Sequence, residues 1–185
     1  MTILALILGA FFNRLRGGMF AGFKYAKHIY DIAFAAFFTV GAALHGLSGF
    51  QLATLFCTLF LCSWIGRSFG WGAYIGNMIR RKDNGEQENI LIDWVRKKYQ
   101  PVLTNTIVLS LRGFLWTLPI AVGFCLNGVN FFYAFLVSIV GLLMGVVYYI
   151  TIEVAEKFTY RSEGWKYGEY VWGAVLWCGI YVILY

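Results

Sequence analysis

Long apolar runs alternate with short charged patches along this chain, and each patch lies at only one end of the runs beside it. Every charged residue except one arginine falls within Arg14–Asp31, Arg67–Lys98 or Glu153–Glu169. The other ends of the long runs meet in two neutral hairpins, Leu44–Phe50 and Leu126–Phe131. Charge confined to one end of each hydrophobic run is typical of a membrane protein with a fixed orientation.

The apolar runs predict helices, and about 20 residues are needed for one crossing. Ile3–Phe12 is too short for a full span and crosses only if the next residues continue it. The sequence therefore predicts five or six membrane segments. The other predicted segments are Ile32–Leu44 with its flanks, Gln51–Gly66, Val102–Leu126, Phe131–Ile152 and Tyr170–Tyr185.

Three stretches between the runs predict pieces at the membrane surface. Phe20–Asp31 and Ile90–Tyr99 have polar residues on one helical face, which favours interfacial helices. The glycine-rich stretch Arg67–Gly76 suits an interfacial or re-entrant segment. The expected fold class is an all-α, polytopic transmembrane helical bundle, with residues 1–185 forming a single integral-membrane domain.

Composition supports this interpretation and gives it an orientation. Apolar residues make up 60%, charged residues 13%, and mean hydropathy is +0.68, which excludes an ordinary soluble domain. The net charge of +6 does not indicate nucleic acid, because the basic residues share their patches with acids and border apolar runs. We expect the basic loops 13–31, 67–100 and 153–169 in the cytoplasm, near anionic lipid head groups, and the C-terminus outside.

Arg112 is the best candidate for function, since it lies alone inside an apolar run. At about 1.5 Å per residue it lies about 16 Å past Pro101, near the membrane midplane, where an arginine costs at least ~2.5 kcal/mol. One explanation is an anion site, such as a phosphate held by the guanidinium fork. The alternatives are a structural partner for Arg112, or a helix that starts later and leaves it at the interface.

Further basic residues would complete such a site. Arg16, Arg67 and Arg161 stand beside glycine-rich backbone at the expected cytoplasmic edge, where they would form a rim around a phosphate. Each would equally well anchor its helix against lipid head groups. Glu153 would orient one arginine by pairing with it.

Other chemistry has little support. His28 and Asp31 have the i, i+3 spacing of a metal site or proton relay, but two ligands are too few, and a solvated interfacial face explains them equally well. We predict no metal and no cofactor. We find no catalytic motif, so enzyme activity is left open and disfavoured. The four cysteines all lie in apolar runs and are expected to be small buried residues. Pairs such as Gly66/Gly70, Gly72/Gly76 and Gly141/Gly145 favour close helix packing.

Four short motifs resemble a family of small multi-pass membrane proteins encoded by tailed phages and prophages. They are Asn13-Arg14-Leu15-Arg16-Gly17-Gly18, Gly66-Arg67, Arg112-Gly113-Phe114-Leu115-Trp116-Thr117-Leu118-Pro119, and Gly168-Glu169-Tyr170-Val171-Trp172-Gly173. The resemblance implies a viral gene product in the bacterial inner membrane. It transfers no catalytic residue.

Two functional hypotheses follow. In the first, the protein binds an anionic lipid or isoprenoid-phosphate head group through an arginine-lined site that opens to the cytoplasmic half, for transfer, flipping or sequestration. In the second, it has no ligand and acts on a host membrane protein, in envelope synthesis, lysis or superinfection exclusion. Assembly into a homo-oligomer is compatible with either hypothesis.

Overall fold

The computed structural model describes residues 1–15, 26–68, 101–158 and 164–185, and within these ranges every regular element is a helix. The all-helical fold class is therefore confirmed for the part of the chain that is described. The six helices are α1 (Thr2–Arg14), α2 (Ala26–Leu44), α3 (Phe50–Arg67), α6 (Pro101–Leu126), α7 (Phe131–Phe158) and α8 (Gly164–Leu184).

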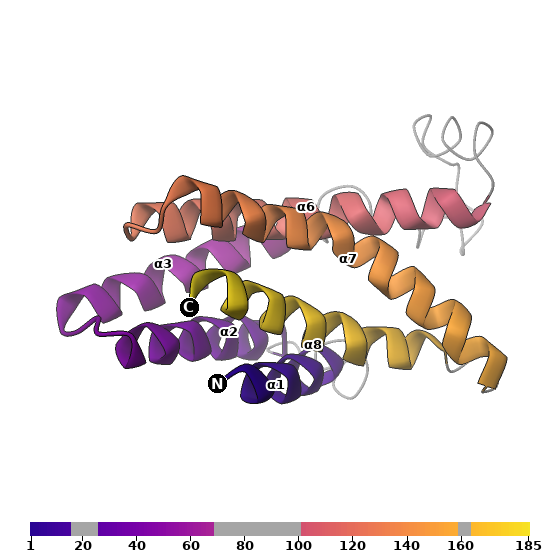
Figure 1. Ribbon diagram of the computed structural model, residues 1–185, viewed down its shortest axis with the longest axis horizontal. Coiled ribbons are helices and arrows are strands. Elements are labelled where there is room, and N and C mark those ends of the chain that lie inside the picture. The colour runs from indigo at the N-terminus through magenta and orange to yellow at the C-terminus, as the bar shows by residue number, and fades with distance from the viewer. Residues whose placement is uncertain (16–25, 69–100, 159–163) are drawn as a thin grey trace.

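The helices form a ring in which neighbours run antiparallel (Figure 1). Following the main contacts around the ring, α1 packs on α8, α8 on α7, α7 on α6, α6 on α3 and α3 on α2. A small contact between α1 and α2 closes it. The two hairpin turns lie at one end of the bundle, and α1 and α3 both end toward the opposite end.

Both hairpins lie where the sequence placed them. α2 ends at Leu44 and α3 begins at Phe50, while α6 ends at Leu126 and α7 begins at Phe131. Their glycines are needed for the turns, because Gly46, Gly49 and Gly128 have φ of 99°, 58° and 88°. Side chains rarely adopt this left-handed backbone, so glycine lets the chain reverse without strain.

The inside of the ring is filled by aromatic side chains. Tyr30, Phe34 and Phe38 recur every four residues on α2, so they form one stripe on that helix. All three are fully buried and lie near Trp177 of α8. The Trp177 Nε1–H donates a hydrogen bond to the Tyr30 hydroxyl at 3.0 Å, which satisfies the buried indole.

Close contacts between helices occur at glycines, as the sequence predicted for Gly66, Gly141 and Gly145. A methyl group on Gly66 would collide with the carbonyl oxygen of Trp116, and one on Gly145 would collide with the backbone of Ser110. Gly141 faces Gly113 in the same way. Gly70, Gly72 and Gly76 lie outside the described residues, so their role stays a prediction.

The start of α2 differs from the sequence-based expectation. We predicted a surface helix over Phe20–Asp31 followed by a separate span, but residues 26–44 form one continuous helix. Asp31 is fully buried on it and is not on a solvated face. The polar periodicity of Lys24, Lys27 and Asp31 was misleading, because the carboxylate has a buried partner. The expected surface helix Ile90–Tyr99 and the stretch from Phe69 to Gly76 lie outside the described residues.

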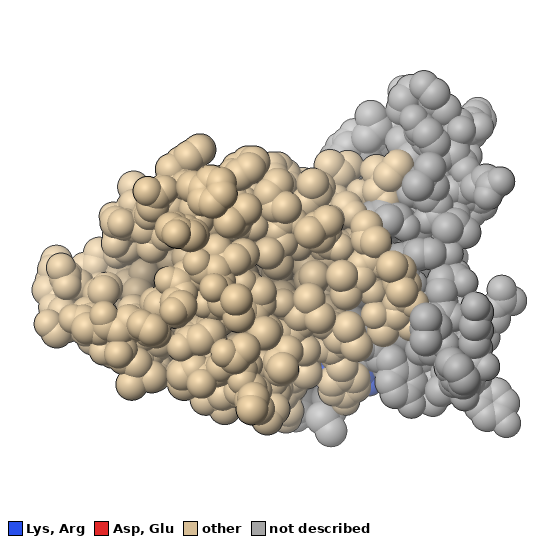
Figure 2. Space-filling view, in the orientation of Figure 1, with Lys and Arg blue, Asp and Glu red and all other residues tan. Residues whose placement is uncertain are grey.

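On the face shown in Figure 2, the described surface carries almost no Lys, Arg, Asp or Glu. Large hydrophobic side chains are exposed on every helix, among them Ile3, Val40, Leu61, Val122, Leu143 and Val182. Within the described residues, Phe50–Arg67 is the one helix whose length and apolar content suffice to cross a membrane. The apolar stretches of the other helices, as far as they are described, are 10–17 residues long.

The cysteines are free thiols, and their environment is more open than expected. Cys57 is exposed, while Cys62, Cys125 and Cys178 are partly buried. The expectation of full burial was wrong, because an apolar run does not reveal which of its faces points outward.

Candidate functional site

The most polar feature of the described interior is an ion pair between α2 and α3. The Arg67 guanidinium donates from Nε and Nη2 to the Asp31 carboxylate, at 3.0 and 2.6 Å to Oδ2. Nε also lies 3.4 Å from Oδ1. The Ser63 hydroxyl donates to Oδ1 at 2.8 Å. Both carboxylate oxygens are therefore hydrogen-bonded, and we call Asp31, Ser63 and Arg67 the ionic cluster.

The hairpin between α2 and α3 creates this cluster. The two helices run antiparallel from the turn, so a position near the start of α2 faces a position near the end of α3. Ser63 and Arg67 are four residues apart and share a face of α3. Phe34, Ala35 and Phe38 follow Asp31 at helical spacing and are all buried, so Asp31 lies on the inward face of α2.

Burial makes this ion pair unfavourable to form, because both charges lose hydration. Removing one partner would be more unfavourable still, because the other charge would stay buried without compensation. Asp31 has no exposed surface, and the Arg67 side chain is 9% exposed. Charges removed from water lose hydration energy, and only close pairing with further hydrogen bonds offsets that loss. The Asp31 carboxylate occupies the Nε–Nη2 edge of the guanidinium, and Nη1 makes no hydrogen bond with the described residues.

Two tryptophans lie beside the cluster. Gly66, the residue before Arg67, packs directly on the backbone of Trp116. The Trp116 ring lies 5.5 Å from Trp172 and 5.8 Å from Tyr30, the residue before Asp31. Trp116 is only 3% exposed, and its Nε1–H has no acceptor among the described residues. The site therefore combines a neutralised ion pair, an aromatic wall and one unsatisfied donor.

Motifs that are distant in the sequence meet at this level of the bundle. A methyl group on Gly173 would lie 2.5 Å from the Asn13 Cβ, so these two motifs are in contact. Trp172 reaches Trp116, and Trp116 reaches Gly66. These are the motifs on which the resemblance in the sequence rests. The fold thus concentrates them in one region between α1, α3, α6 and α8.

Arg112 lies beyond this region, toward the end of the bundle away from the hairpins. Since Trp116 is level with Gly66 and Gly123 with Cys62, residue 112 lies about one helical turn past Gly66. Its side chain is half-buried. Our expectation of a midplane position assumed that α6 enters the membrane at Pro101. Measured against α3, Arg112 lies near the level at which that helix ends, while α6 itself continues to Pro101. Its depth in a membrane stays a prediction.

The remaining predicted site residues are only partly described. Arg67 is brought into the cluster by Asp31, a partner that the sequence analysis did not assign. Arg16 and Arg161 lie outside the described residues, and for Glu153 only the helical backbone of α7 is described. Their roles stay predictions. Arg14, the last residue of α1, has its guanidinium carbon 5.8 Å from the centre of the Tyr170 ring.

Sequence reasoning missed Trp116, and it considered Asp31 only with His28, as a metal site or proton relay, and not as a partner of Arg67. The apolar residues three, four and seven positions after Asp31 were a usable signal, since they place its side chain on the buried face of α2. Trp116 gave no such signal in a run rich in aromatics. Within the described residues, no group of three His, Cys, Asp or Glu side chains is placed to hold a metal ion.

Comparison with known proteins adds no relative. No family model, no curated protein and no solved structure matches this chain.

Proposed function

We propose that this protein is an integral membrane bundle that binds an anionic lipid head group at the end of the bundle away from the hairpins. The observation that carries the proposal is the distribution of charge. None of the charged residues with a described side chain is exposed, whereas large apolar side chains are exposed on every helix. Such a surface suits hydrocarbon far better than water.

The cations among these residues lie toward one end of the bundle. Arg14 is the last residue of α1, Arg67 is the last residue of α3, and Arg112 lies one turn beyond Gly66. Lipid phosphates lie at the ends of membrane helices, where basic side chains attract them. By the rule that basic loops stay inside, this end is the cytoplasmic one.

The ionic cluster assigns different roles to the arginines. Arg67 already has a carboxylate across one edge of its fork, so it would contribute at most Nη1 to a phosphate. Arg112, which the first hypothesis placed on the phosphate, keeps the leading role, and Arg16 and Arg161 remain the expected rim. Trp116 and Trp172 would form an apolar wall beneath the head group.

Lipid analysis of the purified protein tests the proposal. The full chain is extracted in a mild detergent, and its co-purifying lipids are quantified by mass spectrometry against the bulk membrane extract. We expect a phosphate-bearing lipid to be enriched with the wild type and reduced at least fivefold with Arg112→Gln. Arg112→Lys should fall between the two, because it keeps the charge and loses the fork.

Val122→Gln is a matched control, since it introduces the same side chain at an exposed position of the same helix. It should retain the lipid. The proposal would be wrong if no lipid were enriched, or if Arg112→Gln retained as much lipid as Val122→Gln while both eluted as folded protein. A host membrane protein that co-purifies instead would favour the second hypothesis.

A further inference from the structure

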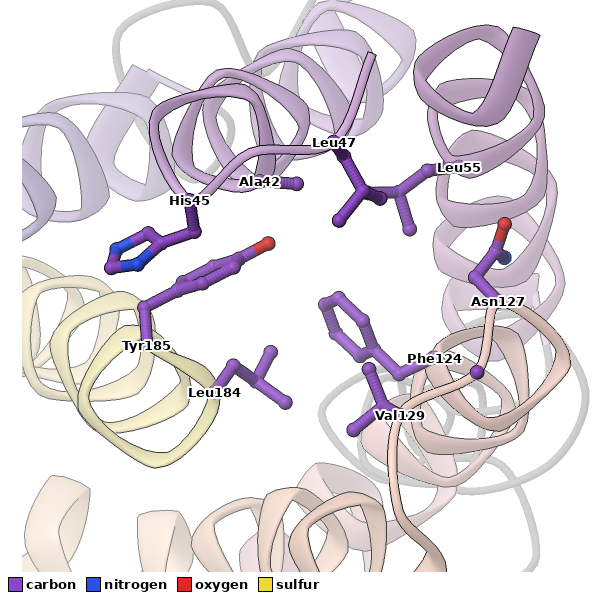
Figure 3. Close-up of a pocket in the computed structure, with 10 residues that line it drawn as sticks. Ala42, His45, Leu47, Leu55, Phe124, Asn127, Val129, Leu184 and Tyr185 are labelled. Atoms are coloured by element: carbon purple, nitrogen blue, oxygen red, sulfur yellow. The ribbon is translucent and has the colours of Figure 1, made fainter.

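A second site lies at the opposite end of the bundle, where the two hairpin turns meet the end of α8. The structure has a cavity of about 310 Å³ there, bounded by the side chains in Figure 3. From Asp31 to Ala42 along α2 is about 16 Å at the usual helical rise, so the cavity is separate from the ionic cluster. Its lining residues are Ala42, His45, Leu47, Leu55, Phe124, Asn127, Gly128, Val129, Leu184 and Tyr185.

Most of the cavity wall is apolar, and no carboxylate, ammonium or guanidinium side chain lines it. Leu47, Leu55, Phe124, Val129 and Leu184 surround the central space in Figure 3. None of the ten lining residues is Asp, Glu, Lys or Arg. An ion would therefore lose its hydration without gaining a partner, and a neutral guest with an apolar body is favoured.

Two polar side chains of the lining already donate a hydrogen bond within the protein, and each still has an oxygen that can accept one. The Tyr185 hydroxyl donates to the carbonyl of Phe38 at 2.8 Å. The Asn127 Nδ2 donates to the carbonyl of Gly123 at 2.8 Å. The Tyr185 oxygen and the Asn127 Oδ1 remain as acceptors, so the cavity suits a guest with a donor group.

The Tyr185 wall is held in place before any guest binds. His45 stacks on the Tyr185 ring with 4.9 Å between the ring centroids. The Tyr181 ring, one turn earlier in α8, lies 5.1 Å from the Tyr185 ring between centroids. Preformed walls lower the entropic cost of binding.

We propose that this cavity binds a neutral amphiphile of about ten non-hydrogen atoms that carries a hydroxyl or amide N–H group. The size follows from the volume, since an apolar cavity of about half this volume holds benzene. The guest would place its apolar chain between Phe124 and Leu184 and donate to Tyr185 or Asn127. A free alkanol and the hydroxyl end of a diacylglycerol share this chemistry.

Photolabelling tests the proposal on the purified full chain. A diazirine analogue of 1-octanol is activated in the sample, and its adducts are mapped by mass spectrometry. We expect saturable adducts on the lining residues, displaced by excess 1-octanol and at least tenfold less well by sodium octanoate. Competition with dioctanoylglycerol in a parallel sample distinguishes a lipid source from a free alcohol.

Val129→Trp fills the cavity from a turn, and Val122→Trp makes the same change at an exposed helical position. Labelling of the cavity should fall at least tenfold in the first variant and stay unchanged in the second. If Val129→Trp does not elute as folded protein, Asn127→Leu replaces it and should weaken octanol competition several-fold. Adducts spread over the exposed surface without saturation would overturn the proposal, as would equal labelling of a folded cavity variant and the control.

Discussion

Asp31 is a carboxylate without contact with solvent, and one guanidinium and one hydroxyl hold its two oxygens. A buried ion pair stabilises a fold only when both charges and their further hydrogen-bond partners are present. Removing one partner leaves the other charge buried without compensation, whereas removing both relieves the loss of hydration. The cluster therefore ties the start of α2 to the end of α3, and it also specifies their register.

Breaking the ion pair should be more harmful than deleting it. We expect Asp31→Leu alone to lower the free energy of unfolding by about 3–5 kcal/mol, because Arg67 is left buried and unpaired. Asp31→Leu combined with Arg67→Met should recover most of that loss. Unfolding of purified protein by a denaturing detergent, followed by circular dichroism, gives the values.

Ser63→Ala provides the graded comparison within the same cluster. It removes one hydrogen bond to the carboxylate and should cost about 1.5–3 kcal/mol. Leu61→Ala, at an exposed position two residues away, should change stability little. A double variant less stable than Asp31→Leu would show that the pair is net stabilising and that the argument from hydration is wrong.

At the scale of the elements, helix contacts depend on positions without a side chain. α6 and α7 approach each other at Gly113 and Gly141, and Thr117 fits into the same contact. The Thr117 hydroxyl donates to the carbonyl of Gly113 at 3.0 Å within α6, and it lies 3.5 Å from the carbonyl of Ser138 on α7. Contacts of this kind join helices through close packing of small residues, with a Ser or Thr hydroxyl adding a hydrogen bond between the helices, as membrane helices commonly do.

Gly141→Ala should separate α6 from α7. The added methyl group would collide with both branches of the Thr117 side chain and with the Gly113 carbonyl, and the carbonyl cannot move without moving α6. We expect a loss of about 1–3 kcal/mol in the free energy of unfolding, typical of an overpacked core. The same detergent titration measures it.

Gly179→Ala is the matched control on α8. Its nearest neighbour would be a methyl group of Val140 at 3.2 Å, which a small side-chain rotation relieves. Replacing a helical glycine by alanine gains about 1 kcal/mol of helix propensity, so stability should hold or rise. Equal losses in both variants would contradict the importance of the Gly113–Gly141 contact.

At the scale of the whole molecule, the ring places both hairpins at one end and the ends of α1 and α3 toward the other (Figure 1). If the bundle crosses a membrane as proposed, the head-group site and the amphiphile cavity would lie on opposite sides of it. The apolar exposed surface between them would be covered by lipid (Figure 2). In the proposed arrangement, the end that carries the basic patches would be the cytoplasmic one.

Cysteine labelling tests this topology. In a variant that lacks the four native cysteines, Ser48→Cys and Asn130→Cys mark the two hairpins, and Gln87→Cys marks the basic loop 67–100. We expect a membrane-impermeant maleimide to label both hairpin positions in spheroplasts and Gln87→Cys only in inverted vesicles, because basic loops stay inside. Hairpin positions that react from opposite sides would contradict the arrangement in the ring.

Several features of the fold could be predicted from the sequence alone. The apolar runs and the turn glycines determined the helices and both hairpins, because periodicity and backbone freedom act locally. Gly66 and Gly141 were recognisable as packing positions, since small residues four apart allow close approach. Arg112 was equally recognisable as the one charged residue inside an apolar run, although its level in the bundle was not.

Tertiary structure alone decided which polar residues meet. Asp31 and Arg67 are 36 residues apart and carry no shared pattern, so their pairing depends on the antiparallel register of α2 and α3. The position of Arg112 relative to Gly66, the contact of Trp116 with Trp172, and the cavity between the hairpins depend in the same way on packing between distant segments. Local sequence encodes helices and turns, whereas a site between helices exists only once their faces and registers are fixed against one another.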